Sequence, residues 1–331
     1  MSNSKMNCNT RVDVGHINIS IPFQSKISDD LDRARHRHLN WIADFGLWPD
    51  KSTQAVFEAA DFPSFVAHVY PWATGSELDL LTDFIGWAWL WDDLFDKSSL
   101  HNTALQELVS NIRAYDDIIE GKRTKIADVP MMAAFRQLIN RINSIASEIW
   151  RERHCTHWKA TFRGFEQEAE NNARKLTPTM HEYLSLRRAA AGTDVCFDWI
   201  EAAGHFELPA HIHADPIFLN LRFDAQDVVN MTNDIFSADN ESRDGNTDNL
   251  ILVLTHHQSC SSRRASELAH EIIAGKIESF QRHEREFYTT NSYTALAPQD
   301  QVNTVSFIDS MKYWMRGSLE WHLRSPRYKS V

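Results

Sequence analysis

The sequence predicts an all-α fold. Apolar residues recur at spacings of three and four along the chain, and no segment shows the alternating pattern of a strand. Only 11 glycines and 10 prolines occur in 331 residues, which argues against a sheet-rich fold with many tight turns. No repeat of about 20–50 residues and no linker rich in Pro, Gly or Ser divides the chain. We therefore expect one helical domain over residues 21–331, preceded by a flexible tail at 1–20.

Composition narrows the classes of function. Apolar residues make up 43% of the chain, enough for a sizeable core. The net charge of −11 disfavours nucleic acid and anionic membrane surfaces as partners. No apolar run reaches about 18 residues, so stable membrane insertion is not expected. The polar N-terminus does not resemble a secretory signal, and the four scattered cysteines form no CxxC pair. We expect a cytoplasmic protein without disulfides or structural zinc.

Periodicity places the helices. In chain order they are expected over residues 29–45, 52–59, 61–69, 76–96, 105–120, 130–177 (as one helix or two), 179–200 with a break, 215–242, 249–255, 262–288 and 302–323.

In the first half of the chain, glycine and proline mark several helix ends. Gly46 ends the first helix, while Pro63 suits the first turn of the third and Pro71 closes it. Ser76 then opens a long apolar helix, and the segment 130–177 carries Arg and Glu on its outer positions.

In the second half, capping residues give clearer boundaries. Thr179 and Glu182 have the spacing of a capping box, so a helix begins there. Gly192 is expected to break that helix. Asp215 followed by Pro216 pairs an N-cap with a proline at the first helical position.

Three carboxylates close the apolar helix that begins at Ser76. Asp92 and Asp96 are four residues apart and share a helix face with Trp89. Burying such carboxylates costs several kcal/mol each unless they are paired or coordinated. A divalent cation resolves this cost, and hard oxygen ligands of this kind suit Mg²⁺ shared with substrate phosphates. Asp93 points to a different face, where we expect it to support the ligands rather than bind metal.

A second stripe of oxygen-bearing side chains lies about 140 residues further on. Asn233, Ser237 and Glu241 are spaced i, i+4 and i+8, so an amide, a hydroxyl and a carboxylate share one helix face. Alone, this stripe could equally face water. Together with Asp92 and Asp96 it indicates a second set of ligands for a hard cation.

Other clusters of metal-ligand residue types are interpreted as structural or solvated. The acidic cluster at 116–120 is surrounded by basic residues and has almost no aromatic wall, so a solvated helix end is expected. His154 and His157 lack a fourth partner for a metal site. Glu166, Glu168 and Glu170 are expected to face water.

The two motifs carry a family resemblance. The sequence at 92–96 resembles the aspartate-rich motif of class I terpene synthases of the microbial single-domain type, and Asn233, Ser237 and Glu241 match the second metal motif of that family. Further matches are Arg187, 46 residues before Asn233, with the family's diphosphate-sensing arginine, and Arg327 and Tyr328 with its C-terminal Arg-Tyr pair. The resemblance extends over about residues 21–328.

The chain departs from the family pattern in one position and leaves another open. Asn240 stands where the family often has Lys before the glutamate of the second motif. The residue that breaks the helix after the sensing arginine is Ala191 or Gly192.

The resemblance implies a helical bundle around a deep apolar cavity. Three Mg²⁺ ions, with Mn²⁺ able to replace them, are implied to bind Asp92, Asp96, Asn233, Ser237 and Glu241 together with the diphosphate of a linear isoprenoid. Arg187, Arg327 and Tyr328 are implied to bind the same diphosphate. Trp89, Trp321 and Phe65 are expected to form the wall that holds the cation.

The implied reaction is ionisation and cyclisation of an isoprenyl diphosphate to a sesquiterpene hydrocarbon or alcohol, with release of diphosphate. Farnesyl diphosphate is the expected substrate, while ten- and twenty-carbon substrates stay open, as does a monomeric or homodimeric state. Two alternatives are open. A chain-elongating isoprenyl diphosphate synthase would carry two aspartate-rich motifs, and a helical scaffold protein would tolerate loss of Asp92 or Asn233.

Overall fold

The described part of the chain is α-helical and contains no strand. The computed structural model describes residues 12–48, 50–99, 104–122 and 129–328, with side chains 94–111 left out of the description. The helices of the first half are α1 (Leu31–Asp44), α2 (Lys51–Ala60), α3 (Phe62–Val69), α4 (Gly75–Ser99), α5 (Ala104–Ile119), α6 (Pro130–Asn143) and α7 (Glu148–Arg174).

The second half continues with helices only. They are α8 (Met180–Ala190), α9 (Thr193–Gly204), α10 (Ala210–His213), α11 (Pro216–Asp244), α12 (Leu250–His257), α13 (Ser262–Phe287), α14 (Asn291–Thr294), α15 (Pro298–Arg324) and the 3₁₀ turn η1 (Pro326–Tyr328). The all-α prediction is therefore confirmed for the described residues.

Caps account for most boundaries. The Thr179–Glu182 capping box is present, and Gly192 separates α8 from α9 with a φ of 62°. The segment 130–177 forms two helices, because Ser147 caps a new helix after a short turn. The last helix begins at Pro298 rather than at 302, because proline is well placed at the first helical position.

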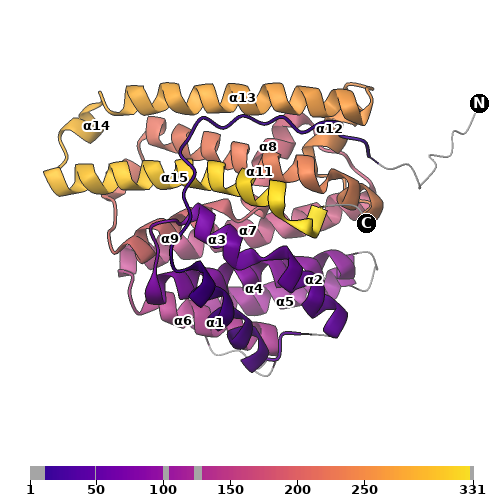
Figure 1. The fold of residues 1–331 in the computed structure, drawn as a ribbon, viewed down its shortest axis with the longest axis horizontal. Coiled ribbons are helices and arrows are strands. Elements are labelled where there is room, and N and C mark those ends of the chain that lie inside the picture. Colours follow the sequence, from indigo (N-terminus) through magenta and orange to yellow (C-terminus); the bar gives the residue numbers. More distant parts are fainter. Residues whose placement is uncertain (1–11, 49, 100–103, 123–128, 329–331) are drawn as a thin grey trace, which may run out of the picture.

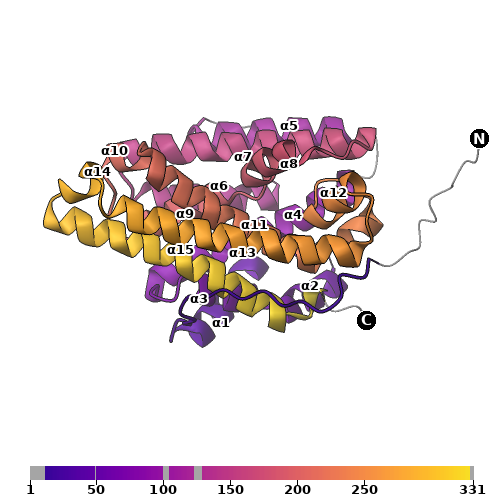
Figure 2. The same ribbon diagram turned by 90° about the horizontal axis from the view of Figure 1, so that it is seen from above.

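The helices pack as layers. Figures 1 and 2 show α11 alongside α13, with α15 crossing beside them, and Figure 1 shows α4 in the other half of the molecule near α1 and α5. The same neighbours appear in the packing contacts: α11 lies against α13, α15, α12 and α8, while α4 lies against α1, α3, α6, α5 and α9. The two helices that carry the oxygen-bearing motifs therefore belong to opposite halves.

An aromatic cluster holds α4 in place. Trp87 stacks on Phe135 of α6 with ring centroids 4.5 Å apart, and Phe84 stacks on Trp199 of α9 at 4.3 Å. All four rings are buried. Burying large rings on this side of α4 fixes the direction in which its other side faces.

One close approach sets the position of α8. A Cβ atom at Gly164 of α7 would lie only 2.6 Å from the backbone nitrogen of Ala190. Only glycine permits that contact without a shift of one helix. The end of α8 is therefore held against α7 immediately before the break at Gly192.

The first described residues are packed, in contrast to the expected flexible tail at 1–20. Figure 2 shows this segment running along α13 and α15 before it reaches α1. Val12 donates its backbone N–H to Asp239 Oδ1 at 3.0 Å, and Val12, Val14, Ile17 and Ile19 pack against the core. The expectation was wrong for residues 12–20, because these apolar side chains cover helix surfaces. Residues 1–11 lie outside the described residues.

No helix among the described residues is both long enough and apolar enough to cross a membrane.

Candidate active site

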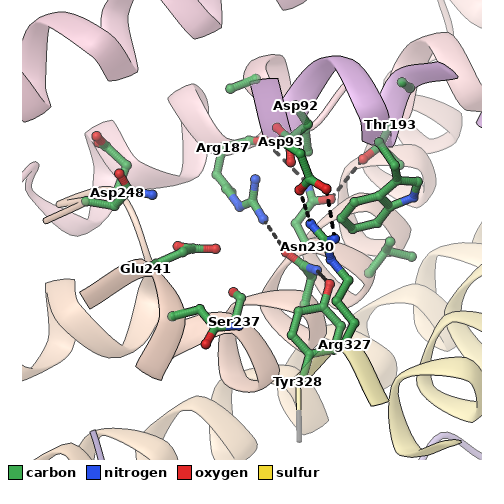
Figure 3. A pocket seen from close by; sticks show the side chains of 18 of the residues that line it. Asp92, Asp93, Arg187, Thr193, Asn230, Ser237, Glu241, Asp248, Arg327 and Tyr328 are labelled. Atoms are coloured by element: carbon green, nitrogen blue, oxygen red, sulfur yellow. Dashed lines mark hydrogen bonds and ion pairs between the residues drawn. The ribbon is translucent and has the colours of Figure 1, made fainter. Parts of the chain in front are cut away.

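A cavity of about 560 Å³ opens between α4, α7, α8, α9, α11 and α15. Asp92 of α4 lines it from one side, and Asn233, Ser237 and Glu241 of α11 line it from another. Figure 3 shows the carboxylate of Asp92 and the polar side chains of α11 around the same space. The structure thus brings together these two sequence motifs from opposite halves of the molecule.

The local sequence explains how α11 presents its three oxygen-bearing residues. Asp215 caps the helix by accepting from the N–H groups of Ile217 and Phe218, and Gly245 ends it in the left-handed region with a φ of 79°. Between these ends the helix is regular, so residues four apart stay on one face. Asn233, Ser237 and Glu241 therefore all line the cavity.

Two carboxyl groups of the cavity have a raised pKa. Burial raises the pKa of Asp92 to about 6, with Asp93 adding repulsion while Arg327 and Arg187 oppose the shift. Burial also raises the pKa of Glu241 to about 7, reinforced by the nearby charge of Asp234. Both shifts mean that the negative charge at these positions lacks full compensation from the protein alone.

Arg187 of α8 is locked onto α11. Its guanidinium donates to Asp234 Oδ1 at 2.8 Å and to Asn233 Oδ1 at 2.8 Å. Asp234 is fully buried and also accepts from the Tyr183 hydroxyl at 2.6 Å and the Leu250 N–H at 2.8 Å. The amide oxygen of Asn233 is thus engaged by Arg187 in this structure.

Arg327 and Tyr328 reach the cavity from the turn η1 after the last helix. Arg327 donates to both carboxylate oxygens of Asp93, at 2.5 and 3.2 Å, and its guanidinium lies 4.7 Å from the centre of the Trp89 ring. The Tyr328 hydroxyl accepts from the Asn233 amide at 3.1 Å. Asp93 therefore lines the cavity and binds Arg327. The expectation that Asp93 supports the metal ligands stays a prediction.

The aromatic wall differs from the expectation in one residue. Trp89 and Phe65 line the cavity, whereas Trp321 does not. Its indole N–H donates to Ala60 O at 2.9 Å, which turns the ring toward the α2–α3 junction. The Trp321 ring lies 5.2 Å from Phe65 and 5.9 Å from Trp89, so it packs behind the two rings that form the wall.

Asp96 lies in α4, but its side chain is outside the described residues. Of the two candidates for the helix break, Ala191 lines the cavity, and Gly192 provides the left-handed backbone beside it. Asn240 also lines the cavity and accepts from Arg243 at 2.5 Å.

Sequence reasoning missed several polar residues of the cavity. Glu168, expected to face water, is half-buried and lines the cavity. Asp248 lines it as well, with a pKa raised to about 6 by burial. Asn249 lies behind the cavity wall, where its amide donates to Glu241 Oε2 at 3.1 Å and lies 3.4 Å from Ser237 Oγ. Only Asn249 had a signal in the sequence, as the N-cap of α12.

The other clusters have protein partners. His154 and His157 both contact Asp198 through Nδ1, at 3.1 and 2.7 Å. In the acidic cluster at 116–120, Asp116 pairs with Arg163 at 2.8 Å. Within the ranges that the structure describes, no group of three or more His, Cys, Asp or Glu side chains is placed to hold a metal ion.

A helical bundle whose apolar cavity carries oxygen-bearing side chains on two facing helices is the architecture expected of a class I terpene synthase. A family model described as "Terpene synthase family 2, C-terminal metal binding" matches residues 83–279, more than half of the chain. The chain belongs to this family, and it is a terpene synthase, a lyase.

Individual relatives span nearly the whole chain. It is 26% identical to pristinol synthase of Streptomyces pristinaespiralis over 318 residues, covering 94% of this chain and 84% of that one. It is 25% identical over 323 residues to a Streptomyces viridochromogenes enzyme named 7-epi-alpha-eudesmol synthase ((2E,6E)-farnesyl diphosphate cyclizing), covering 95% and 92%. The crystal structure of a-eudesmol synthase matches with a TM-score of 0.85 at 24% identity, covering 94% of this chain and all of that one, and so shares its fold.

The raised carboxyl pKa values predict a pH dependence of cation binding. Because the pKa of Glu241 is about 7 and that of Asp92 about 6, the empty site keeps extra protons below pH ~7. Cations require the deprotonated forms. Binding of Mg²⁺ with pyrophosphate should therefore release more protons at pH ~6.5 in the wild-type protein than in Glu241→Gln, a comparison that cancels the protons released by pyrophosphate itself. Calorimetry in buffers of different ionisation enthalpy measures the difference, and equal proton release by the two proteins would contradict the assignment.

Asn249 should orient two of the oxygen-bearing residues. Asn249→Ser keeps a good N-cap for α12 but removes the amide, which donates to Asp234 O at 2.9 Å and also reaches Glu241 and Ser237. We expect a loss of about 1 kcal/mol of stability from the buried hydrogen bond to Asp234 O, and Mg²⁺ affinity lower by about 10–100-fold, measured by titration with pyrophosphate present. Asn249→Ala, which also removes the cap, should lose about 1 kcal/mol of stability in addition. Wild-type affinity in the serine variant would show that Asn249 serves the helix end only.

Proposed function

We propose that this terpene synthase ionises and cyclises farnesyl diphosphate to a sesquiterpene, with Mg²⁺ as its cofactor. The observation that carries the proposal is the composition of one cavity. Hard oxygen atoms from α4 and α11 gather at one part of it, and the remaining wall is mainly apolar and aromatic. Its volume of about 560 Å³ falls in the range of pockets that enclose a ligand of this size.

The donor set fits magnesium. An amide, a hydroxyl and two carboxylates are hard oxygen ligands, and the raised pKa values of Asp92 and Glu241 indicate a lack of positive charge where these ligands converge. We propose that Asp92, Asp96, Asn233, Ser237 and Glu241 hold the ions, three in number, which Mn²⁺ can replace. When bound, such ions supply Lewis-acid stabilisation of the departing diphosphate.

Two arginine side chains of the protein, Arg187 and Arg327, line the same cavity. Arg187 is held by Asp234 and Asn233, and Arg327 by Asp93. Arginine suits a diphosphate because its planar fork donates several hydrogen bonds at once. We propose that both arginines, with the Tyr328 hydroxyl, bind the diphosphate. The negative charge that develops on the diphosphate when the C–O bond breaks is then already compensated.

The aromatic wall of the cavity then stabilises the carbocation. Trp89 and Phe65 offer aromatic faces that attract a cation by up to about 2 kcal/mol each when water is excluded. Trp321 supports both rings from behind. In the present structure the guanidinium of Arg327 lies over Trp89, so movement of Arg327 to the diphosphate uncovers that ring face.

The relative from Streptomyces viridochromogenes is named for cyclising (2E,6E)-farnesyl diphosphate, which supports the fifteen-carbon substrate.

The test of the proposed function is incubation of the purified protein with Mg²⁺ and, in parallel, geranyl, farnesyl or geranylgeranyl diphosphate. We expect cyclic fifteen-carbon volatiles by gas chromatography and equimolar diphosphate. Turnover of only the ten- or twenty-carbon substrate would correct the chain length. Longer diphosphates formed with added isopentenyl diphosphate would favour chain elongation, and no diphosphate release would refute the proposal.

A further inference from the structure

Two buried polar side chains interrupt the apolar part of the cavity. Thr193, the first residue of α9, and Asn230 of α11 both line the cavity and are only 3% and 4% exposed. The Thr193 hydroxyl donates to Asn230 Oδ1 at 2.8 Å. Neither residue belongs to the metal motifs, so the proposed diphosphate chemistry gives them no role.

The pair lies just beyond the proposed metal site. Asn230 precedes Asn233 by three residues on the same helix, which is about 4.5 Å along the axis. Figure 3 shows Thr193 on the side of the pocket away from Glu241 and Asp248. Two neighbouring residues of the lining are the weakly polar Cys196 and the apolar Val229. The pair therefore faces the space where the hydrocarbon part of a bound substrate would lie.

Hydrogen-bond capacity is left over at both residues. The amide of Asn230 has two N–H groups, and its recorded acceptor is Arg187 O at 3.5 Å, a carbonyl that already accepts from Ala191 N–H at 3.0 Å. The Thr193 oxygen uses its proton toward Asn230 and keeps its lone pairs. One strong donor and one acceptor thus lie side by side, which is what a single water molecule needs.

Holding α9 to α11 does not require this pair. Asp194 already accepts from Arg222 and from Gln226 of α11, both at 2.6 Å. Replacing both members of a buried polar pair by apolar groups of similar shape is often nearly neutral for stability. The cavity must contain a carbocation, so we infer that this hydroxyl and this amide in its wall take part in the reaction.

We propose that Thr193 and Asn230 hold the water molecule that ends the reaction, so that the product is a terpene alcohol. This inference rests on the proposed function. In the step, a lone pair of the water oxygen forms a C–O bond to the cyclised carbocation. The resulting oxonium ion then loses one proton to an oxygen of the released diphosphate. No redox change occurs, and the hydroxyl oxygen of the product comes from water.

The first test is the origin of the oxygen. The wild-type protein is incubated with farnesyl diphosphate and Mg²⁺ in H₂¹⁸O, and the volatiles are analysed by gas chromatography and mass spectrometry. We expect an alcohol as the main product, carrying one ¹⁸O atom. A wild-type product that is entirely hydrocarbon would overturn the inference while leaving the proposed function intact. Absence of diphosphate release would refute the proposed function and this inference together.

Matched variants test the residues. Thr193→Val keeps the shape but removes the hydroxyl, and it should lower the ratio of alcohol to hydrocarbon by about tenfold or more. Thr193→Ser restores the hydroxyl and should recover the wild-type ratio, which a role in packing alone would not predict. Diphosphate release is measured in parallel, so that a change in the final step is separated from a change in ionisation.

Ser318→Ala is the control. Ser318 is another buried hydroxyl in the cavity lining, but its oxygen lies 3.3 Å from His322 Nδ1. The alcohol ratio of this variant should match wild type. Overturning results are a wild-type ratio in folded Thr193→Val, or an equal fall of the ratio in Ser318→Ala.

Discussion

Asp92→Asn should lower the rate of diphosphate release from farnesyl diphosphate by about a thousandfold. The substitution keeps the size of the side chain but removes a charged oxygen ligand at the α4 side of the cavity, where charge stabilisation in the transition state is lost. Because burial raises the pKa of Asp92, its charge destabilises the empty protein. The asparagine variant should therefore melt at the same temperature as wild type or higher, at pH ~7.5. Diphosphate release and thermal melting measure the two effects.

Asp117→Asn is the matched control for this substitution. Asp117 belongs to the other acidic cluster, where Lys122 lies 3.8 Å from its carboxylate, and it does not line the cavity. The rate of diphosphate release by Asp117→Asn should stay near that of the wild-type protein. Equal rates of diphosphate release in Asp92→Asn and wild type would contradict the proposed role of Asp92 in binding the cations.

Arg187→Gln should damage both stability and activity. The variant leaves Asp234 fully buried and without its cation, and breaking such a pair costs about 3–5 kcal/mol of unfolding free energy. It also removes a proposed donor to the diphosphate, which should slow diphosphate release by about 10²–10³-fold. Urea unfolding gives the first quantity, and an assay of released diphosphate at a temperature where the variant is folded gives the second.

The neighbouring arginine provides a close comparison. Arg188 pairs with Asp227, but Asp227 also lies 2.8 Å from Lys276, so a cation remains after Arg188→Gln. Arg188 does not line the cavity. We expect a smaller loss of stability and a rate within a few-fold of wild type. Similar rates in the two variants would argue against a diphosphate-binding role for Arg187.

The parts of the site that lie on one regular helix were predictable from the sequence. The spacing of Asn233, Ser237 and Glu241 places them on one face whatever the tertiary structure, and the caps at Asp215 and Gly245 are local signals. Helix existence was predictable for the same reason. The short helices α10 and α14, each four residues long, give no periodic pattern and were not expected.

Residues whose position depends on distant partners were not predictable in the same way. Trp321 turns away from the cavity because its indole finds backbone carbonyls about 260 residues earlier in the chain. Asp93 faces Arg327, 234 residues away, a partner that its position on α4 does not reveal. Glu168 reads as one of several solvated acids until α7 is placed beside the cavity. The side chain of Asp96, the cytoplasmic location and the oligomeric state stay predictions.

The central claim is that one diphosphate is held by cations bound between α4 and α11. A crystal structure with Mn²⁺ and pyrophosphate tests it most directly, because anomalous scattering locates the ions independently of the surrounding density. We expect ions bound by Asp92 on one side of the diphosphate and by Asn233, Ser237 and Glu241 on the other, with Arg187 and Arg327 turned toward the phosphate oxygens. Pyrophosphate bound outside the cavity, or ions that contact neither helix, would contradict the account.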